Sequence, residues 1–413
     1  MKNIKKLAEE CLNCKNPLCR IKGCPISTNI PGFIKDIKEE NIEEAYRTLQ
    51  ENNILSSICS EICPVEQQCM GSCIKAIKGT PVQINTLEQY VNTYAEKQNL
   101  ELKIEKKNNN KKVAVIGSGP AGISCAYELV KKGYKVTIFE KEEKCGGVLE
   151  YGIPDFRLNK ESINKVINRL KNYGVEIKNN ISFGKEIAIE SLKNDGFEAI
   201  FLGVGAEIAS TYSLGIRNQN ILTSTDVLYS YNKGKHLNLG TVAVIGGGNV
   251  AIDSARVAKK MKAKKVYILY RRNRELMPAR DVEIEDALKD GVEIVYNTKV
   301  VKAVEENGKI KSVICTKTKV EGNSIIDIEN SEMEINVDTV VFAIGLKPNL
   351  NFEIETENGL IKIDEKGKTN IEGVFAGGDV TDSKLTVCKA ILAGKKAAEG
   401  IESYLKSEAV AVN

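Results

Sequence analysis

The chain has 413 residues, which is too long for one ordinary core and predicts two or three domains. Its 59 basic and 55 acidic side chains are mixed along the sequence, with no basic stripe interleaved with aromatic residues of the kind that binds nucleic acid. No apolar run approaches the ~18 residues of a membrane span, and the first residues lack the apolar stretch of a signal peptide. We therefore expect a cytoplasmic protein that binds neither nucleic acid nor a membrane.

Two residue types restrict the chemistry further. His236 is the one histidine, which nearly excludes a mechanism that needs both a histidine base and a histidine ligand. Eight of the twelve cysteines lie between Cys11 and Cys73. In a reducing cytoplasm, such a group indicates metal binding or redox chemistry rather than a disulfide framework.

Residues 1–103 are expected to form a helical domain around these cysteines. Proline directly after a cysteine is typical of iron–sulfur clusters, whose bridging sulfides accept hydrogen bonds from constrained loops. A structural zinc site is the alternative that the spacing alone leaves open. The spacing is Cys11-x2-Cys14-x4-Cys19-x4-Cys24-Pro, then Cys59-x3-Cys63-Pro-x4-Cys69-x3-Cys73.

A polar, charged segment at residues 104–112 is interpreted as a linker, although a basic tail that binds another molecule is possible. From Val113 onward, short β-branched strands alternate with helices, which predicts parallel, doubly wound sheets. One strand–helix–strand unit starts at residue 113 and a second starts at residue 241. The sequence therefore predicts two nucleotide-binding domains of the α/β class.

The first dinucleotide motif follows a strand directly and opens a helix. Its glycines allow a tight turn, a close approach of pyrophosphate and close helix–strand packing, while the helix N-terminus supplies amide donors. Glu140 ends the next strand, where a carboxylate can accept hydrogen bonds from ribose hydroxyls. Glycines alone could be a structural turn, but strand, helix and acid together favour binding. The candidate residues in the loop are Gly117, Gly119, Ala121 and Gly122.

The second motif also lies between a strand and a helix, but the strand that follows it ends in Arg271 and Arg272 instead of an acid. Two guanidinium groups favour a 2′-phosphate and hence NADPH over NADH. Paired arginines that merely solvate a strand end are the alternative, and Arg280 could also reach the phosphate. The candidate residues in the loop are Gly246, Gly248, Asn249 and Val250.

A third motif assigns the first site to a flavin. Near the C-terminus, Gly378 and Asp379 precede a helical stretch and resemble the glycine–aspartate motif of flavoproteins with two dinucleotide-binding domains. In those flavoproteins the aspartate holds the ribityl chain of FAD. The following helix N-terminus would stabilise negative charge on reduced flavin. Upstream, Gly147 would let the backbone pass close to the flavin, and Arg157 is a further candidate.

We therefore expect an FAD domain at 113–235 and 346–413, with an NAD(P)H domain at 236–345 inserted in it. Residues 338–345 are interpreted as the strand that returns the chain from the inserted domain. Cys145 has no second cysteine four or five residues further on, which argues against a disulfide reductase. The remaining cysteines lie in apolar patterns and are expected to be small core residues: Cys125, Cys315 and Cys388.

Nearly the whole chain resembles the small (β) subunit of bacterial glutamate synthase. The same module forms the N-terminal half of dihydropyrimidine dehydrogenase and the large subunit of the electron-bifurcating ferredoxin:NADP oxidoreductase. The resemblance implies FAD, NADPH (with NADH possible) and two 4Fe-4S clusters. It implies one cluster held by Cys11, Cys14, Cys19 and Cys73, and another held by Cys24, Cys63, Cys69 and Glu88.

Three positions qualify this ligand assignment. Four residues separate Cys19 from Cys24 where the family usually has three, so the loop must bulge. Glu88 could instead be an exposed helix residue. Cys59 matches a family cysteine that is not a ligand.

The resemblance implies hydride transfer from nicotinamide to flavin, followed by single electrons passing to the clusters. This chemistry needs stacked rings rather than proton transfer, so no catalytic side chain is expected. Residues 113–413 amount to about two dinucleotide domains, so we expect no further domain that could bind a terminal substrate. We therefore expect an electron-accepting partner subunit. The open alternatives are a glutamate synthase, a dihydropyrimidine dehydrogenase or bifurcating enzyme, and a non-catalytic nucleotide-binding redox sensor.

Overall fold

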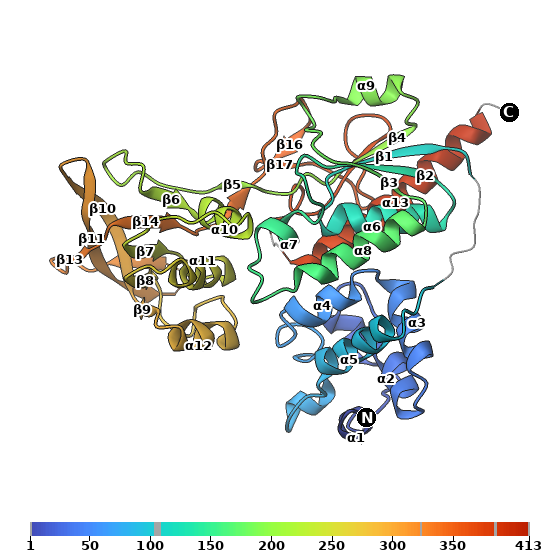
Figure 1. The fold of residues 1–413 in the computed structure, drawn as a ribbon, viewed down its shortest axis with the longest axis horizontal. Helices are drawn as coiled ribbons and strands as arrows, with labels where there is room; N and C mark the ends of the chain where they lie inside the picture. The colour runs from blue at the N-terminus through green and yellow to red at the C-terminus, as the bar shows by residue number, and fades with distance from the viewer. Residues whose placement is uncertain (1, 103–108, 323, 384–385, 412–413) are drawn as a thin grey trace. The chain divides into compact units, whose positions relative to one another are not determined.

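The computed structural model describes residues 2–102, 109–322, 324–383 and 386–411 (Figure 1). The contacts of the chain divide it into two compact units. Unit 1 comprises residues 1–150, 156–206 and 350–413, and unit 2 comprises residues 151–155 and 207–349. Most of the expected linker, at 104–108, lies outside the described residues. No helix in the described part is both long enough and apolar enough to cross a membrane.

Short helices form the N-terminal part of unit 1. Helix α3 begins after Asn41, whose side-chain oxygen accepts a hydrogen bond from the Glu44 amide at 3.3 Å. The apolar faces of the helices meet in a core that contains Phe33, Leu49 and Leu87, all of them fully buried. The elements are α1 (Lys2–Glu9), η1 (Cys19–Gly23), α2 (Ile30–Lys38), α3 (Ile42–Asn52), α4 (Ser56–Ile62), η2 (Ile74–Ile77) and α5 (Ile84–Lys97).

The rest of unit 1 is built on a parallel sheet with the strand order β18-β4-β1-β2-β3. Its central strands are almost wholly apolar and buried, as expected of a parallel sheet covered by helices on both faces. The strands are β1 (Lys112–Ile116), β2 (Lys135–Phe139), β3 (Glu176–Lys178), β4 (Ala199–Leu202) and β18 (Val374–Ala376), with a hairpin of β16 (Thr356–Glu357) and β17 (Leu360–Ile361). The helices are α6 (Pro120–Lys131), α7 (Val148–Tyr151), α8 (Lys160–Asn172), α9 (Ile189–Asn194) and α13 (Val387–Ala411).

Helix α13 packs unusually closely on α6 (Figure 1). A Cβ atom at Gly394 would lie 2.2 Å from the carbonyl oxygen of Ala121, so only glycine fits at this crossing. The hydroxyl of Ser124 also donates a hydrogen bond to the Ile391 carbonyl at 3.1 Å. The C-terminal helix is thereby held against the helix that follows the first glycine motif.

The cysteine-bearing helices belong to the same compact unit as this sheet. The Tyr127 hydroxyl of α6 donates to the Gln50 carbonyl at 3.1 Å, and the Lys395 ammonium of α13 donates to the Asn52 carbonyl at 2.7 Å. Arg169 of α8 donates to the Gln50 side-chain oxygen at 2.6 Å. These contacts join the expected helical domain at 1–103 to α6, α8 and α13 within one compact unit.

Unit 2 contains a second parallel sheet with the order β6-β14-β7-β8-β9 and an antiparallel sheet formed by β10 to β13. The strands of the parallel sheet are β6 (Ile221–Thr223), β7 (Thr241–Ile245), β8 (Lys265–Leu269), β9 (Glu293–Val295) and β14 (Thr339–Phe342). Those of the antiparallel sheet are β10 (Thr298–Glu306), β11 (Lys309–Glu321), β12 (Ser324–Asp327) and β13 (Met333–Asn336). The unit also contains α10 (Ser224–Asn232), α11 (Asn249–Lys260), α12 (Asp281–Lys289) and the strand pair β5 (Ile208–Ala209) and β15 (Leu346–Lys347).

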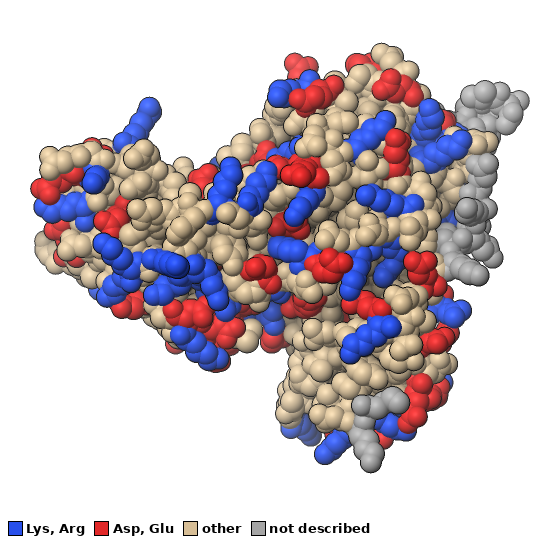
Figure 2. Space-filling view, in the orientation of Figure 1, with Lys and Arg blue, Asp and Glu red and all other residues tan. Residues whose placement is uncertain are grey.

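The two parallel sheets confirm the expected α/β class with two Rossmann-like parts. The limits of the inserted part differ from the sequence interpretation, since unit 2 begins at residue 207 rather than 236. The reason is that β6 pairs with β14, with Ile221 opposite Val340. Strand β14 also pairs with β7, so residues 339–342 form a strand of the sheet of unit 2, inside the expected limits of the inserted domain. Figure 2 shows acidic and basic side chains interspersed over the face in view.

Candidate functional site

Four cysteines that the family resemblance assigns to one cluster line a single pocket of about 60 Å³ in unit 1. Its other walls are largely apolar and include Ile30, Ile34 and Val82. Burial, and then the neighbouring Cys73 sulfur, raises the pKa of the Cys19 thiol to about 11. A pocket with several thiol donors and an apolar lining suits a thiolate-bound metal centre. The four cysteines are Cys11, Cys14, Cys19 and Cys73.

The extra residue between Cys19 and Cys24 is accommodated by the backbone. Residues 19–23 form one π-helical turn, in which the Cys24 amide donates to the Cys19 carbonyl at 2.9 Å. A π turn takes one residue more than an α turn, which is the bulge that the spacing predicted. Gly23 then lets this turn approach Cys69, since a Cβ atom at Gly23 would lie 2.8 Å from the Cys69 Cα.

Three members of the second predicted ligand set influence one another electrostatically. Burial, and then the charge of Glu88, raises the pKa of Cys69, and Glu88 adds to the burial that raises the pKa of Cys24. Glu88 is half-buried on α5, and burial raises its own pKa well above the usual range. No hydrogen bond or ion pair to its carboxylate occurs among the described residues. Glu88 is therefore not the exposed helix residue that the sequence left open, and its role as a cluster ligand stays a prediction.

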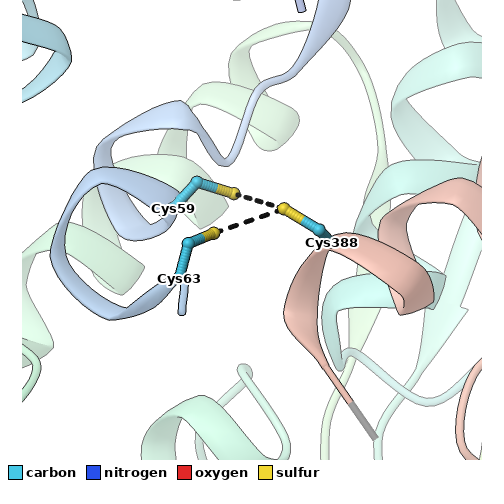
Figure 3. A group of neighbouring side chains, drawn as sticks. All are labelled: Cys59, Cys63 and Cys388. Atoms are coloured by element: carbon cyan, nitrogen blue, oxygen red, sulfur yellow. Dashed lines mark hydrogen bonds between the residues drawn. The ribbon is translucent and has the colours of Figure 1, made fainter. Parts of the chain in front are cut away.

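The fourth member, Cys63, lies in a group of three buried thiols with Cys59 and Cys388 (Figure 3). The Cys388 sulfur is 3.3 Å from that of Cys63 and 3.9 Å from that of Cys59. The contact with Cys388 lowers the pKa of the Cys59 thiol well below its usual range and raises that of Cys63, and either sulfur of each pair can be the hydrogen-bond donor. The interpretation of Cys388 as a simple core residue is therefore incomplete, because its sulfur contacts a predicted cluster ligand.

The first glycine motif forms an open cradle at the N-terminus of α6. Gly117 has a φ of +91°, and a Cβ atom on it would lie 2.5 Å from the Gly203 carbonyl oxygen. At Gly122 a Cβ atom would lie 2.0 Å from the Gly117 carbonyl oxygen, so the turn requires glycine there too. A Cβ atom at Gly119 would meet nothing within 4 Å. Open space in front of the helix N-terminus suits a pyrophosphate group.

The other predicted flavin residues surround this loop. The buried Glu140 carboxylate accepts hydrogen bonds from the amides of Ser118 and Glu142, both at 2.9 Å. A Cβ atom at Gly147 would lie 3.1 Å from the Gly119 Cα, and one at Gly378 would lie 2.9 Å from the Ala121 Cβ. The structure thus brings these residues together in unit 1. Arg157 is half-exposed between α7 and α8.

Asp379 follows β18 and Gly378 and is half-buried. Burial, together with the charge of Asp382, raises the pKa of its carboxyl to about 6. An unfolded aspartate has a pKa of ~3.9, so this carboxyl stabilises the flavin-free fold at low pH. That contribution is lost as the pH rises through about 6.

We expect the affinity for FAD to depend on the ionisation of Asp379, because a carboxylate accepts a hydrogen bond from a ribityl hydroxyl more strongly than the neutral acid does. Below a pH of about 6, the Kd of flavin-depleted protein for FAD should rise by about tenfold per pH unit. Asp379→Asn should weaken FAD binding and remove this pH dependence. Quenching of FAD fluorescence measures both effects, with the exposed Asp195→Asn as the matched control. An unchanged profile in Asp379→Asn would contradict the assigned role.

The second glycine motif forms a similar loop in unit 2. Gly246 has a φ of +148°, and a Cβ atom on it would lie 2.3 Å from the Ala343 carbonyl oxygen. A Cβ atom at Gly248 would meet nothing within 4 Å. The Asn249 side-chain oxygen accepts a hydrogen bond from the Arg280 amide at 3.0 Å, which ties the loop to the segment before α12. Val250, in the first turn of α11, is exposed.

The arginines near this loop differ in their partners. Arg280 lies 3.8 Å from Glu283, and Arg274 is paired with Asp281. For the guanidinium groups of Arg271 and Arg272, which follow β8, the described part of the chain contains no ion-pair partner. Their charge is therefore available for an anionic ligand, whereas that of Arg280 is partly neutralised.

Comparison with known proteins identifies a family for the N-terminal cysteine-bearing helices and another for the part with the two glycine motifs. Residues 111–406 match the family described as pyridine nucleotide-disulphide oxidoreductase, and residues 1–100 match dihydropyrimidine dehydrogenase domain II with a 4Fe-4S cluster. The chain is 31% identical to the glutamate synthase (NADPH) small chain of Escherichia coli K12, over 97% of this chain and 91% of the relative. It is 32% identical to the NAD-dependent dihydropyrimidine dehydrogenase subunit PreT of the same strain, over 97% and 94%. The structure of FprA from Mycobacterium tuberculosis in complex with NADPH is similar in fold, with a TM-score of 0.65 and 15% identity over 74% of this chain and 86% of that chain.

Proposed function

Because the chain belongs to the glutamate synthase small-subunit-like family of NAD(P)H-dependent FAD and iron–sulfur oxidoreductases, we propose that it oxidises NADPH and delivers the electrons to a partner subunit of the glutamate synthase type. The observation that carries this proposal lies in unit 1. A pocket lined by four thiols and an open dinucleotide cradle belong to the same compact body. One chain thus combines donors for a metal cluster with a site for a flavin nucleotide.

The proposed roles follow from the position of each residue. The amides at the start of α6 bind the FAD pyrophosphate, Glu140 holds a ribose, and Asp379 holds the ribityl chain. Arg271 and Arg272 bind the 2′-phosphate of NADPH. FAD, when bound, converts between the two-electron chemistry of nicotinamide and the one-electron chemistry of iron–sulfur clusters.

The cysteine ligands would hold the clusters in two sets. The first set consists of the four cysteines that line the pocket: Cys11, Cys14, Cys19 and Cys73. The second consists of Cys24, Cys63 and Cys69, with Glu88 as the non-cysteine ligand. Cys145 lies outside both sets, and its thiol contacts the Asn179 side-chain oxygen at 3.7 Å. Cys145 also has no second cysteine four or five residues further on with which to form a redox disulfide. We therefore do not propose a disulfide-reductase activity, although the matched family is described as pyridine nucleotide-disulphide oxidoreductase.

An electron-accepting partner is expected because the relatives are named as small chains or subunits of larger enzymes. We propose a complex located in the cytoplasm, associated with neither nucleic acid nor membrane. A dihydropyrimidine dehydrogenase subunit is the second candidate, favoured by the 94% coverage of PreT. The two candidates differ in the expected nucleotide, since PreT is named as NAD-dependent and Arg271 and Arg272 favour NADPH.

Anaerobic purification from native cells, followed by absorption and EPR spectroscopy, tests the proposal. NADPH should bleach the flavin and then produce the EPR signal of reduced clusters. A co-purifying subunit with an amidotransferase domain would support the glutamate synthase type, and a pyrimidine-binding flavoprotein would support the second candidate. A chain without flavin and iron would exclude both, and a flavin that NADPH does not bleach would indicate a nucleotide sensor.

A further inference from the structure

Cys388 joins the C-terminal helix to the end of α4 through its sulfur atom (Figure 3). It lies in the first turn of α13, the helix that follows the Gly378-Asp379 motif, and it is 3% exposed. Its sulfur is 3.3 Å from that of Cys63, a residue more than 300 positions earlier in the chain. This distance is short enough for an S–H···S hydrogen bond. The contact therefore connects the helix next to the flavin motif with a predicted cluster ligand.

The donor direction of this contact follows from its two ends. At one end, the Asn53 side-chain amide nitrogen donates to the Cys59 sulfur at 3.3 Å. The orientation of that amide is fixed, because the Asn53 side-chain oxygen accepts a hydrogen bond from the Leu55 backbone amide at 2.9 Å. Cys59 is thus the acceptor for Asn53, and its own S–H can point to Cys388, 3.9 Å away.

At the other end, a cysteine bound to iron is a thiolate and can only accept. If Cys63 is a ligand, the proton between Cys63 and Cys388 must belong to Cys388. Cys388 then no longer donates to Cys59, which keeps its own S–H. The result is one directed chain, from Asn53 through Cys59 and Cys388 to Cys63. Each donor in such a chain polarises the next, and little water weakens it because the three thiols are buried.

We propose that Cys388 is a positioning residue for the second cluster: its S–H donates a hydrogen bond to the Cys63 thiolate and raises the reduction potential of that cluster. This inference rests on the proposed function, because it takes Cys63 as a cluster ligand. A donor to a ligating sulfur withdraws negative charge, which favours the more negative, reduced form of the cluster. The helix that begins beside the flavin motif would thereby help the cluster to accept electrons.

The test is an EPR-monitored redox titration of the anaerobic holoprotein, with iron content measured for each variant. Cys388→Ala should retain the iron of both clusters but lower the midpoint potential of one of them. We expect the equilibrium constant for its reduction to fall by about tenfold, which is ~59 mV for a one-electron couple. Cys388→Ser keeps a hydroxyl donor and should restore part of the shift. The matched control is Cys125→Ala, which removes a buried thiol of α6 in the same unit.

Cys59→Ala provides an independent measurement if Cys388→Ala does not fold. It leaves the Cys388 donor in place but removes its support, so it should shift the same potential in the same direction by a smaller amount. Unchanged potentials in variants that retain their iron would overturn the inference. Loss of iron from Cys388→Ala would also overturn it, because Cys388 would then be a ligand. Absence of clusters from the wild-type protein would instead refute the proposed function.

Discussion

Replacing Cys19 with alanine is expected to remove one iron–sulfur cluster and to interrupt electron delivery, while NADPH still reduces the flavin. Cys19 lines the pocket with three other thiols, and no described residue of that pocket offers a carboxylate or imidazole as a substitute ligand. Iron per chain should therefore fall by about half. Transfer of electrons to a one-electron acceptor should fall by about 100-fold or more, since loss of a mere supporting group at a metal site already costs about 10- to 100-fold in affinity or activity.

The two half-reactions separate this effect from misfolding. Flavin bleaching by NADPH should be nearly unchanged, because hydride transfer requires only the two bound nucleotides. Cys315→Ala is the matched control, since it removes a fully buried cysteine from β11 of unit 2. Stopped-flow absorbance follows the flavin, and EPR follows the clusters. Full iron content in Cys19→Ala would show that Cys19 is not a ligand.

The nucleotide loops could be predicted from the sequence because their constraints are local. Gly122 must be glycine on account of the Gly117 carbonyl, five residues away, and Gly246 occupies a conformation that other residues avoid. The paired arginines follow β8 after a single residue, Tyr270, so the sequence indicated their place at the strand end. The structure added that Arg280, the third candidate, already lies near Glu283.

The cluster ligands could not be predicted from local sequence pattern alone. The spacing of the cysteines indicated a metal centre, but their division into two sets came from the resemblance to a family. Cys388 was missed because it lies in an apolar helical pattern, and its contact with Cys63 depends on how α13 packs against α6. A cysteine in the first turn of a helix that follows a flavin motif was the available signal. Sequence pattern alone does not report such a long-range contact.

The limits of unit 2 were misplaced for a similar reason. Strand β6 has only three residues and carries little hydrophobic pattern of its own. Its assignment depends on pairing with β14, more than 100 residues later. The antiparallel sheet of β10 to β13 was also not anticipated, because alternation of strands and helices was taken to continue through the whole domain.

The second large effect is expected on kcat/KM for NADPH, through the two arginines that follow β8 in unit 2. Reversing the charge of Arg271 and Arg272 to glutamate should lower kcat/KM for NADPH by about 100-fold or more, because each charge-assisted hydrogen bond to phosphate contributes ~1.5–3 kcal/mol. A factor of ten corresponds to ~1.4 kcal/mol. NADH lacks the 2′-phosphate, so its kcat/KM should change by no more than about threefold, which is ~0.7 kcal/mol. The preference for NADPH over NADH should therefore reverse.

Steady-state reduction of an artificial acceptor by each nucleotide measures this preference. Lys264→Glu is the matched control, because it reverses one exposed charge just before β8 begins, at the opposite end of the strand from the two arginines. It should leave the ratio of the two kcat/KM values unchanged. Equal losses for NADPH and NADH in the double variant would mean that the arginines support the fold of the loop. NADPH would then no longer be the expected nucleotide, and a glutamate synthase would no longer be preferred over an NAD-dependent dihydropyrimidine dehydrogenase.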